Sequence, residues 1–201
     1  MIEWVRANCS AVVRGNHDRA CTGQEDLEWF NPVARQAALW TQQALTRENT
    51  EYVLSLPKGP LEIAGFQLTH GSPYDEDEYL LCAEDAGQAF GYLEQRLAFF
   101  GHTHLQGGYI WNRSRVETVR RPGLDCRREL LDIDTACAYL INPGSVGQPR
   151  DGDPRAAYAV YDSDAGMVAY HRVEYDVEAA QNSIRNAGLP PVLAERLSVG
   201  R

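Results

Sequence analysis

The sequence lacks the features that mark membrane, secreted and nucleic-acid-binding proteins. No segment approaches the ~20 consecutive apolar residues of a membrane span, and the first residues include Glu3 where a signal peptide would have an apolar core. No run of Lys or Arg exceeds two residues, and the formal net charge is −9. Binding of a nucleic-acid polymer needs a basic stretch or face. We therefore expect neither a membrane nor a nucleic-acid partner.

Paired cysteine motifs and repeats are also missing. The five cysteines are odd in number and include no Cys-X-X-Cys pair, which excludes a structural zinc site of the usual spacing. Reduced thiols predict a cytoplasmic protein. There is no internal repeat or low-complexity segment, and 201 residues suit one domain, 1–201. A hydrophobic content of 44% is ordinary for a globular chain and is enough for a core.

Histidine is scarce, and its placement is informative. There are five histidines, and two of them, His102 and His104, follow an apolar run that ends at Gly101. This pattern predicts a buried strand that ends in a tight turn, where the glycine permits close approach or an unusual backbone dihedral. Two surface histidines on a loop are the alternative interpretation.

The surroundings of His17 and His70 resemble this stretch. Each follows a short apolar segment and has a glycine nearby, in Val12-Val13-Arg14-Gly15-Asn16-His17-Asp18 and in Phe66-Gln67-Leu68-Thr69-His70-Gly71. Strands that end at one edge of a sheet bring their following loops together. We therefore expect one cluster of nitrogen and oxygen donors, suited to Mn, Fe, Zn or Ni, made by Asn16, His17, His70, His102 and His104.

These motifs carry a family resemblance. Gly15-Asn16-His17-Asp18, Thr69-His70-Gly71 and Gly101-His102-Thr103-His104, in this order, resemble the calcineurin-like metallophosphoesterases. A later stretch, Asn142-Pro143-Gly144-Ser145 with Gln148-Pro149-Arg150, is similar to the smaller bacterial and archaeal predicted phosphodiesterases. The resemblance covers about residues 9–172 and leaves residues 177–201 as a helical C-terminal extension.

The chain also departs from that family. Family members begin with a strand ending in Asp-X-His and a second ending in Gly-Asp, which supply the first metal and the aspartate that bridges both ions. No Asp-X-His occurs here, and the only Gly-Asp is Gly152-Asp153, after the other motifs. The sequence thus predicts the family fold without its first strands, a loss of ~30 residues or more. Carboxylates that could replace the missing ones are Asp75, Glu76 and Asp77.

The resemblance implies a role for each site residue. Asn16, His70 and His102 would hold the second metal, and His104 the first. His17 would donate a proton to the leaving oxygen or stabilise developing negative charge, and Asp18 would orient His17, unless Asp18 is only a helix cap. The loop with Asn142, Gly144, Ser145 and Arg150 would bind substrate, or else form a structural turn. His171, on a late strand, is expected to be structural.

The expected secondary structure is mixed. A short helix over residues 1–8 precedes a strand at 9–14, a helix from Pro32 to about Leu45 with Val33, Ala37, Trp40 and Ala44 on one face, and a helix capped by Thr46. A hairpin turns at Gly65, two helices lie between residues 75 and 97, and a strand follows at 98–100. Later strands are expected at 108–112, 116–120, 129–134, 139–142, 156–161 and 167–174, and helices at 177–186 and after 192.

The sequence therefore predicts an α/β (α+β) fold of two packed mixed sheets flanked by helices. The predicted function is metal-dependent hydrolysis of small phosphoesters. The complete family site holds two ions, and at most one is expected here. The alternative is a non-catalytic relative that acts as a binding or regulatory module. An unpaired edge on the strand at 9–14 would further permit self-association.

Overall fold

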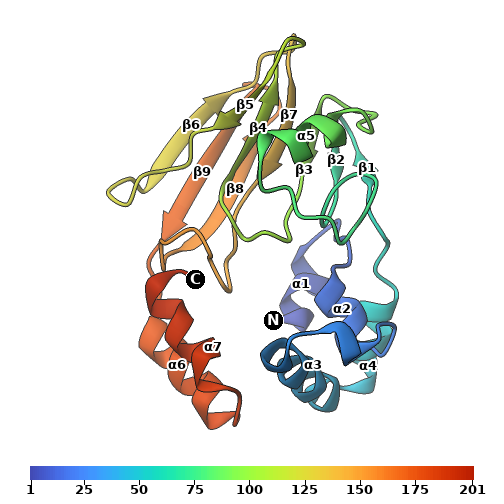
Figure 1. Ribbon diagram of the computed structural model, residues 1–201, viewed down its shortest axis with the longest axis vertical. Coiled ribbons are helices and arrows are strands. Elements are labelled where there is room, and N and C mark those ends of the chain that lie inside the picture. The colour runs from blue at the N-terminus through green and yellow to red at the C-terminus, as the bar shows by residue number, and fades with distance from the viewer.

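The structure is a computed structural model that describes residues 1–201, except for the side chain of Trp29. Two β-sheets fill one end of the molecule, and two groups of helices lie at the other end, as Figure 1 shows. The helices, with two 3-10 turns (η1 and η2), are α1 (Ile2–Asn8), α2 (Asn16–Cys21), η1 (Leu27–Trp29), α3 (Pro32–Ala44), α4 (Arg47–Leu54), α5 (Ala83–Phe90), α6 (Val177–Asn186), α7 (Pro191–Glu195) and η2 (Arg196–Val199).

The larger sheet is mixed and has the order β1-β2-β3-β7-β4-β5. Strands β2, β3 and β7 run parallel, and β1, β4 and β5 pair antiparallel to their neighbours. The smaller sheet, β6-β9-β8, is antiparallel throughout. The strands are β1 (Leu61–Ile63), β2 (Phe66–Leu68), β3 (Leu97–Phe99), β4 (Gly107–Trp111), β5 (Val116–Val119), β6 (Arg128–Asp132), β7 (Ala138–Asn142), β8 (Ala156–Asp162) and β9 (Met167–Val173).

Strand β7 shows how the two layers form from an alternating pattern. Leu140 belongs to a core with Phe90 of α5, whereas Tyr139 and Ile141 pack with Tyr170 of β9 between the sheets. Successive side chains of a strand point to opposite faces, so a strand buried on both sides must be apolar at every position. The expected fold of two packed sheets flanked by helices is confirmed.

The starts of four helical elements, η1, α3, α4 and α6, are set by capping side chains. Asn31 Oδ1 accepts the Ala34 N–H at 2.9 Å, and Pro32 occupies the first turn of α3. Thr46 Oγ1 accepts the Asn49 N–H at 3.2 Å at the start of α4. These contacts satisfy donors that a helix N-terminus leaves unpaired, and both helices begin where the sequence predicts.

Three expectations about secondary structure are wrong. Residues 9–14 form no strand, although the Arg14 N–H donates to the Pro57 carbonyl at 2.9 Å. A strand needs a neighbour along its length, and the larger sheet ends at β1 instead, so the unpaired edge expected at 9–14 does not form. Residues 75–97 contain one helix, α5, rather than two. In α3 the buried residue is Ala38, and Trp40, on the apolar face that the sequence indicates, is 42% exposed.

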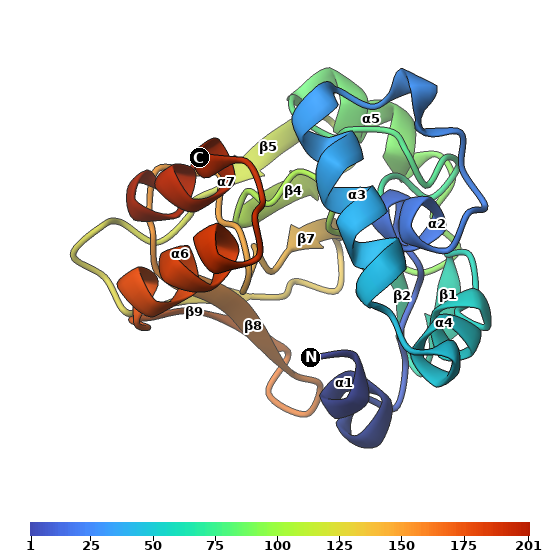
Figure 2. The same cartoon turned by 90° about the horizontal axis from the view of Figure 1, so that it is seen from below.

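The helices gather around one end of the sheets. Figure 2 shows α6 and α7 on one side of this end and α2 and α3 on the other. Of the helices that the structure describes, none is long and apolar enough to cross a membrane. All five cysteines are free thiols. The ends of the parallel strands β2, β3 and β7 therefore open toward a region bounded by helices from both ends of the chain.

Candidate active site

The histidine motifs follow the ends of neighbouring parallel strands. The strand pairing continues past β2 and β3, since the Thr69 N–H donates to the Phe99 carbonyl at 2.9 Å and the Gly101 N–H donates to the His70 carbonyl at 2.8 Å. Continued pairing fixes the backbone of His70 beside that of Gly101. The rings of His70 and His102 consequently lie 4.7 Å apart between centroids.

Asn16 reaches the same point from the first turn of α2. Its Oδ1 lies 3.1 Å from His70 Nε2. The preceding Gly15 packs against the His70 ring so closely that a Cβ there would meet the ring at 2.6 Å. Glycine is thus required at position 15 for the helix to approach His70. The structure brings together Asn16, His70 and His102, the three residues expected to share an ion.

The turn that carries His102 and His104 has an unusual backbone. Both residues have a φ of 61°, in the left-handed region that non-glycine residues seldom adopt. The strained positions are the histidines, whereas a Cβ at Gly101 would come no closer than 3.6 Å to the His70 carbonyl oxygen, an ordinary contact. Asn142 holds this turn, because its Nδ2 donates to the Gly101 carbonyl at 3.0 Å and to Thr103 Oγ1 at 2.9 Å.

Backbone carbonyls orient two of the imidazoles. His102 Nε2 donates to the Asp77 carbonyl at 3.0 Å, and His104 Nδ1 donates to the Gln148 carbonyl at 2.7 Å. In a neutral imidazole the other nitrogen then carries the lone pair, which is Nδ1 in His102 and Nε2 in His104. Metal-binding histidines are commonly oriented in this way by a carbonyl on the opposite nitrogen.

The imidazoles are neutral at physiological pH. Burial lowers the pKa of His70 to about 4, with a smaller contribution from His102. Burial and then the charge of Arg150 lower the pKa of His104 to about 4. Burial also lowers the pKa of His102. A neutral ring is the form that binds a metal ion, so the electrostatics of the cluster suit ligation.

His17 and Asp18 take different positions. His17 lines the pocket described below and packs edge-on against Phe30, with ring centroids 5.8 Å apart. Burial and the nearby Arg150 lower the pKa of His17. Asp18 Oδ2 accepts the Gly15 N–H at 2.7 Å, which is the helix-cap arrangement, and burial raises the pKa of Asp18. The hydrogen bond that orients His17 in the sequence-based interpretation is thus replaced by a contact to Gly15.

The polar groups of the 142–145 loop form hydrogen bonds with other groups of the protein. Asn142 Oδ1 accepts the Gly144 N–H at 2.9 Å, and Ser145 Oγ accepts the Gln148 N–H at 2.9 Å. Gly144 has a φ of +87°, and a Cβ there would lie 2.5 Å from that of Ala157. These contacts describe a structural turn. Of the four residues expected to bind substrate, Arg150 is the one that lines the pocket.

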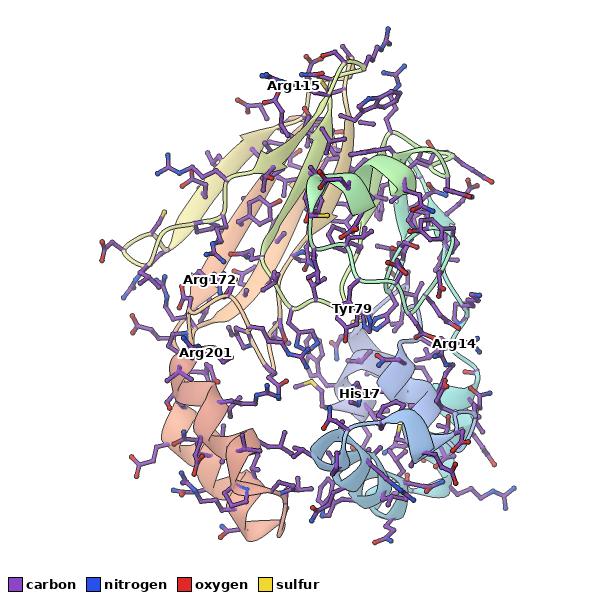
Figure 3. The ribbon with its side chains drawn as sticks, in the orientation of Figure 1. Arg14, His17, Tyr79, Arg115, Arg172 and Arg201 are labelled. Carbon is purple, nitrogen blue, oxygen red and sulfur yellow. The ribbon has the colours of Figure 1, made fainter. Side chains whose placement is uncertain are left out.

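A pocket of about 580 Å³ lies in front of the imidazoles. His17 and Tyr79 lie near the middle of the molecule, as labelled in Figure 3. Sequence reasoning missed Tyr79, whose ring lies 3.8 Å from that of His102 between centroids, and it missed the wall made by the C-terminal helices. The lining residues are Asn16, His17, Phe30, Asn31, Val33, Ala34, Ala37, Tyr79, His104, Gly147, Gln148, Arg150, Ile184, Leu189, Leu193, Arg196 and Leu197.

The structure places Arg155, His171 and Tyr74 away from the pocket. Arg155 pairs with Asp153 at 2.6 Å. His171 stacks on Tyr158 of β8, with ring centroids 4.8 Å apart. Tyr74 packs against the α5 core, and the side chain of Trp29 lies outside the described part of the chain. None of these residues contributes a described contact to the pocket.

The carboxylates near the site are bound to arginines. Arg14 donates to Glu76 through Nε at 3.1 Å, and Arg19 pairs with Asp77 at 2.6 Å. Glu76 also pairs with Arg19. Across the described residues, no group of three or more His, Cys, Asp or Glu side chains is arranged to hold a metal ion. Of the three candidate replacements for the missing ligands, Glu76 and Asp77 therefore serve a salt-bridge network, and Asp75 Oδ1 accepts the Asp77 N–H at 2.9 Å.

The donor set fits one ion better than two. His70 Nε2 donates to Asn16 Oδ1 at 3.1 Å, a separation that two ligands each ~2.1 Å from one ion also have. The bond from His102 Nε2 to the Asp77 carbonyl leaves the Nδ1 lone pair free, on a ring whose centroid lies 4.7 Å from that of His70. A pair of ions needs a shared carboxylate to offset their repulsion, and Glu76 and Asp77 are engaged with Arg14 and Arg19.

Comparisons with known proteins agree on a family. The model of the calcineurin-like phosphoesterase superfamily domain matches residues 2–166. An uncharacterized protein of Methanocaldococcus jannaschii is 35% identical over 216 residues, an alignment that covers 100% of this chain and 79% of that protein.

Two solved structures are similar in fold. A metallophosphoesterase from Sphaerobacter thermophilus has a TM-score of 0.84 and 40% sequence identity, covering 100% of this chain and 81% of that one. A hypothetical protein from Pyrococcus horikoshii has a TM-score of 0.75 at 17% identity, covering 100% and 77% of the two chains, which is a likeness of fold.

Proposed function

Since the chain belongs to the calcineurin-like phosphoesterase superfamily, we propose that it is a metal-dependent hydrolase of small phosphoesters. One observation supports the proposal: Asn16 Oδ1 lies 3.1 Å from His70 Nε2, and the ring centroids of His70 and His102 lie 4.7 Å apart. His17 and His104 line the pocket in front of them. We further propose the cytoplasm as its compartment, in keeping with five free thiols.

In this proposal three side chains hold one divalent ion. Asn16 Oδ1, His70 Nε2 and His102 Nδ1 are the donors, and imidazole and amide ligands suit Mn, Fe, Zn or Ni. When bound, such an ion polarises phosphoryl oxygens and lowers the pKa of a bound water. His104 offers a further lone pair from the same turn. We expect at most one ion per chain, because Glu76 and Asp77 pair with arginines.

His17 is proposed to act on the leaving oxygen of the substrate. Its pKa is lowered by burial and by Arg150, so in the free protein the ring is neutral and donates an N–H. A phosphate bound near Arg150 offsets the positive charge of Arg150 and favours protonation of His17. The ring then either donates its proton to the leaving oxygen or stabilises the negative charge that develops there.

The second candidate function is phosphoester binding without turnover. The salt bridges from Glu76 and Asp77 to arginines favour it, because most of the water activation in family sites comes from two ions. Under this alternative the pocket and its imidazoles bind a phosphoester as a binding or regulatory module.

Hydrolysis of p-nitrophenyl phosphate with added Mn²⁺ or with EDTA distinguishes the two candidates. The variant His102→Ala removes a proposed ligand, and His171→Ala is the matched control, because His171 stacks on Tyr158 instead of lining the pocket. The enzyme proposal predicts Mn²⁺-stimulated hydrolysis that His102→Ala loses and His171→Ala retains. Mn²⁺ binding that His102→Ala abolishes, without stimulated hydrolysis, would establish the binding module.

A further inference from the structure

The pocket is positively charged although the chain carries a net charge of −9. Its charged lining residues are Arg150 and Arg196. No aspartate or glutamate is among the described residues that line it. Two positive charges in an otherwise acidic protein mark this pocket as an anion site.

The two arginines share one neutral acceptor. Gln148 Oε1 accepts from Arg150 Nε at 3.2 Å and Nη2 at 2.9 Å, and from Arg196 Nη1 at 3.4 Å. Among the described residues, the ion pairs include neither arginine. The buried Nε of Arg196 has no hydrogen-bond partner among the described residues.

This arrangement differs from that of the two buried arginines of the chain, Arg19 and Arg172. Arg19 is paired with Glu25 and Asp77, and Arg172 with Asp151. Guanidinium groups have five donors in a planar fork that matches phosphate oxygens. Arg150 and Arg196 have donors left over, and their like charges repel until an anion is bound between them.

The C-terminal segment fixes Arg196 at the pocket. The Gly152 N–H donates to the Gly200 carbonyl at 2.9 Å, and Gly200, with a φ of +62°, packs against the backbone of Asp153. Leu197, next to Arg196, is 4% exposed. The end of the chain is therefore attached to the loop that follows Arg150, which holds both arginines on one wall.

The rest of the pocket is apolar. Phe30 and Val33 lie on the side of η1 and α3, and Ile184, Leu189 and Leu193 lie on the side of α6 and α7. Figure 2 shows these two groups of helices facing one another. A volume of about 580 Å³ falls in the range of pockets that hold small organic molecules.

We propose that Arg150 and Arg196 bind the doubly charged phosphate of a phosphomonoester whose organic group is apolar and lies between α3 and α6–α7. The inference rests on the proposed function, since it names the substrate class of the same pocket. A dianion matches two guanidinium charges, and the apolar walls would leave the sugar and charged backbone of a polynucleotide without partners.

Isothermal titration calorimetry of the full chain in EDTA tests this inference apart from catalysis. The probes are phenyl phosphate and inorganic phosphate. We expect phenyl phosphate to bind at least about tenfold more tightly, because its ring buries apolar surface in the pocket. Arg196→Gln should weaken phenyl phosphate binding about tenfold, since a charge-assisted hydrogen bond is lost.

Arg185→Gln is the matched control, because Arg185 lies on α6, is exposed and donates to Asn182. It should bind phenyl phosphate as the wild type does. Equal affinity of Arg196→Gln and Arg185→Gln would overturn the inference, and so would equal affinity of the wild type for the two probes.

A measurement on the wild type covers the case in which Arg196→Gln does not fold. Arginines are modified with phenylglyoxal and mapped by mass spectrometry. Phenyl phosphate should slow modification of Arg150 and Arg196 and leave Arg185 unaffected, whereas equal rates with and without it would refute the anion site. If phenyl phosphate binding depends on Arg196 but the wild type shows no Mn²⁺-stimulated hydrolysis, the proposed function alone is refuted.

Discussion

Two polar clusters on either side of the 143–155 loop use the same residue types in opposite ways. In the first, the Arg172 network, Arg172 Nε donates to Gln106 Oε1 at 2.8 Å and its Nη atoms pair with Asp151. Gln106 Nε2 donates to the carbonyls of Pro143 and His171. In the second, the pocket cluster, Arg150 and Arg196 share the Gln148 amide oxygen.

The two clusters differ in whether their charged and hydrogen-bonding groups all have partners within the protein. In the Arg172 network each charge has an opposite charge, and the side chains of Arg172 and Asp151 are 1% exposed. In the pocket cluster a buried donor of Arg196 has no described partner, and the His104 ring presents its Nε2 lone pair. A saturated buried network stabilises the fold, whereas leftover donors and lone pairs are what a ligand can use. The comparison predicts that mutations in the two clusters separate stability from activity.

Arg172→Ala should have the largest effect. It leaves the Asp151 carboxylate buried without its partner, which costs ~3–5 kcal/mol of the free energy of unfolding. Urea denaturation measures this loss. The control Arg115→Ala removes an exposed pair with Glu117 and should cost at most ~1 kcal/mol. Similar losses for both variants would mean that the Arg172 network is not a stabilising element.

His17→Ala should affect turnover and spare stability. In an active protein we expect the rate of p-nitrophenyl phosphate hydrolysis to fall by ~10²-fold or more, as for loss of an acid catalyst, with metal content and urea midpoint unchanged. Metal content and turnover are measured on the same preparation, with His171→Ala as the control. Loss of the metal together with activity would make His17 a ligand and contradict its assignment.

Gly15→Ala tests the close approach of α2 to His70. Its Cβ would lie 2.6 Å from the His70 ring, so the ring must move away from Asn16. We expect Mn²⁺ affinity to fall by roughly tenfold, the lower end of the effect of disturbing a ligand's surroundings. Gly147→Ala, at a pocket residue with open space around it, is the control for calorimetric titration. Unchanged affinity in Gly15→Ala would show that His70 needs no support from α2.

Glu76→Gln should give the smallest effect, visible in the pH dependence of stability. Burial alone would raise the pKa of Glu76, but hydrogen bonds and charges from Arg14 and Arg19 outweigh burial and lower it. A lowered pKa in the folded state adds stability above the unfolded value of ~4.5, and this contribution is lost as the pH falls through the folded pKa.

Urea denaturation at pH 7 and pH 3.5 compares the two states of this carboxyl. Wild type should lose more stability on acidification than Glu76→Gln. Glu117→Gln, at an exposed pair, should follow the wild type. An identical loss in wild type and Glu76→Gln would remove Glu76 from the account of acid sensitivity.

Much of the fold could be predicted from the sequence because its signals are local. The Asn31-Pro32 cap, the Gly65 hairpin and the alternation in β8 and β9 each lie within a few residues. Residues 9–14 show the limit of this reasoning, because an apolar segment becomes a strand only where a neighbour pairs with it. At that position the Arg14 N–H meets the Pro57 carbonyl, outside any strand.

The candidate site was predictable in part for the same reason. Strand-end motifs indicated that Asn16, His70 and His102 would lie near one another, and the structure places Asn16 Oδ1 3.1 Å from His70 Nε2 and the rings of His70 and His102 4.7 Å apart between centroids. Tyr79 and Arg196 carry no motif, and tertiary packing alone brings them to the pocket. The pairing of Glu76 with Arg14 could not be predicted from the sequence either, because the two residues lie 62 positions apart in the chain.

Metal stoichiometry tests the central claim, that Asn16, His70 and His102 hold a single ion in this chain. Wild type, His70→Ala and His171→Ala are incubated with Mn²⁺, passed through a desalting column and analysed by mass spectrometry of the metal, beside an assay of bis-p-nitrophenyl phosphate. We expect one ion and no more in wild type and His171→Ala, none in His70→Ala, and turnover of this diester near background; a wild type without an ion would contradict the claim. Two ions per chain with robust turnover would contradict it.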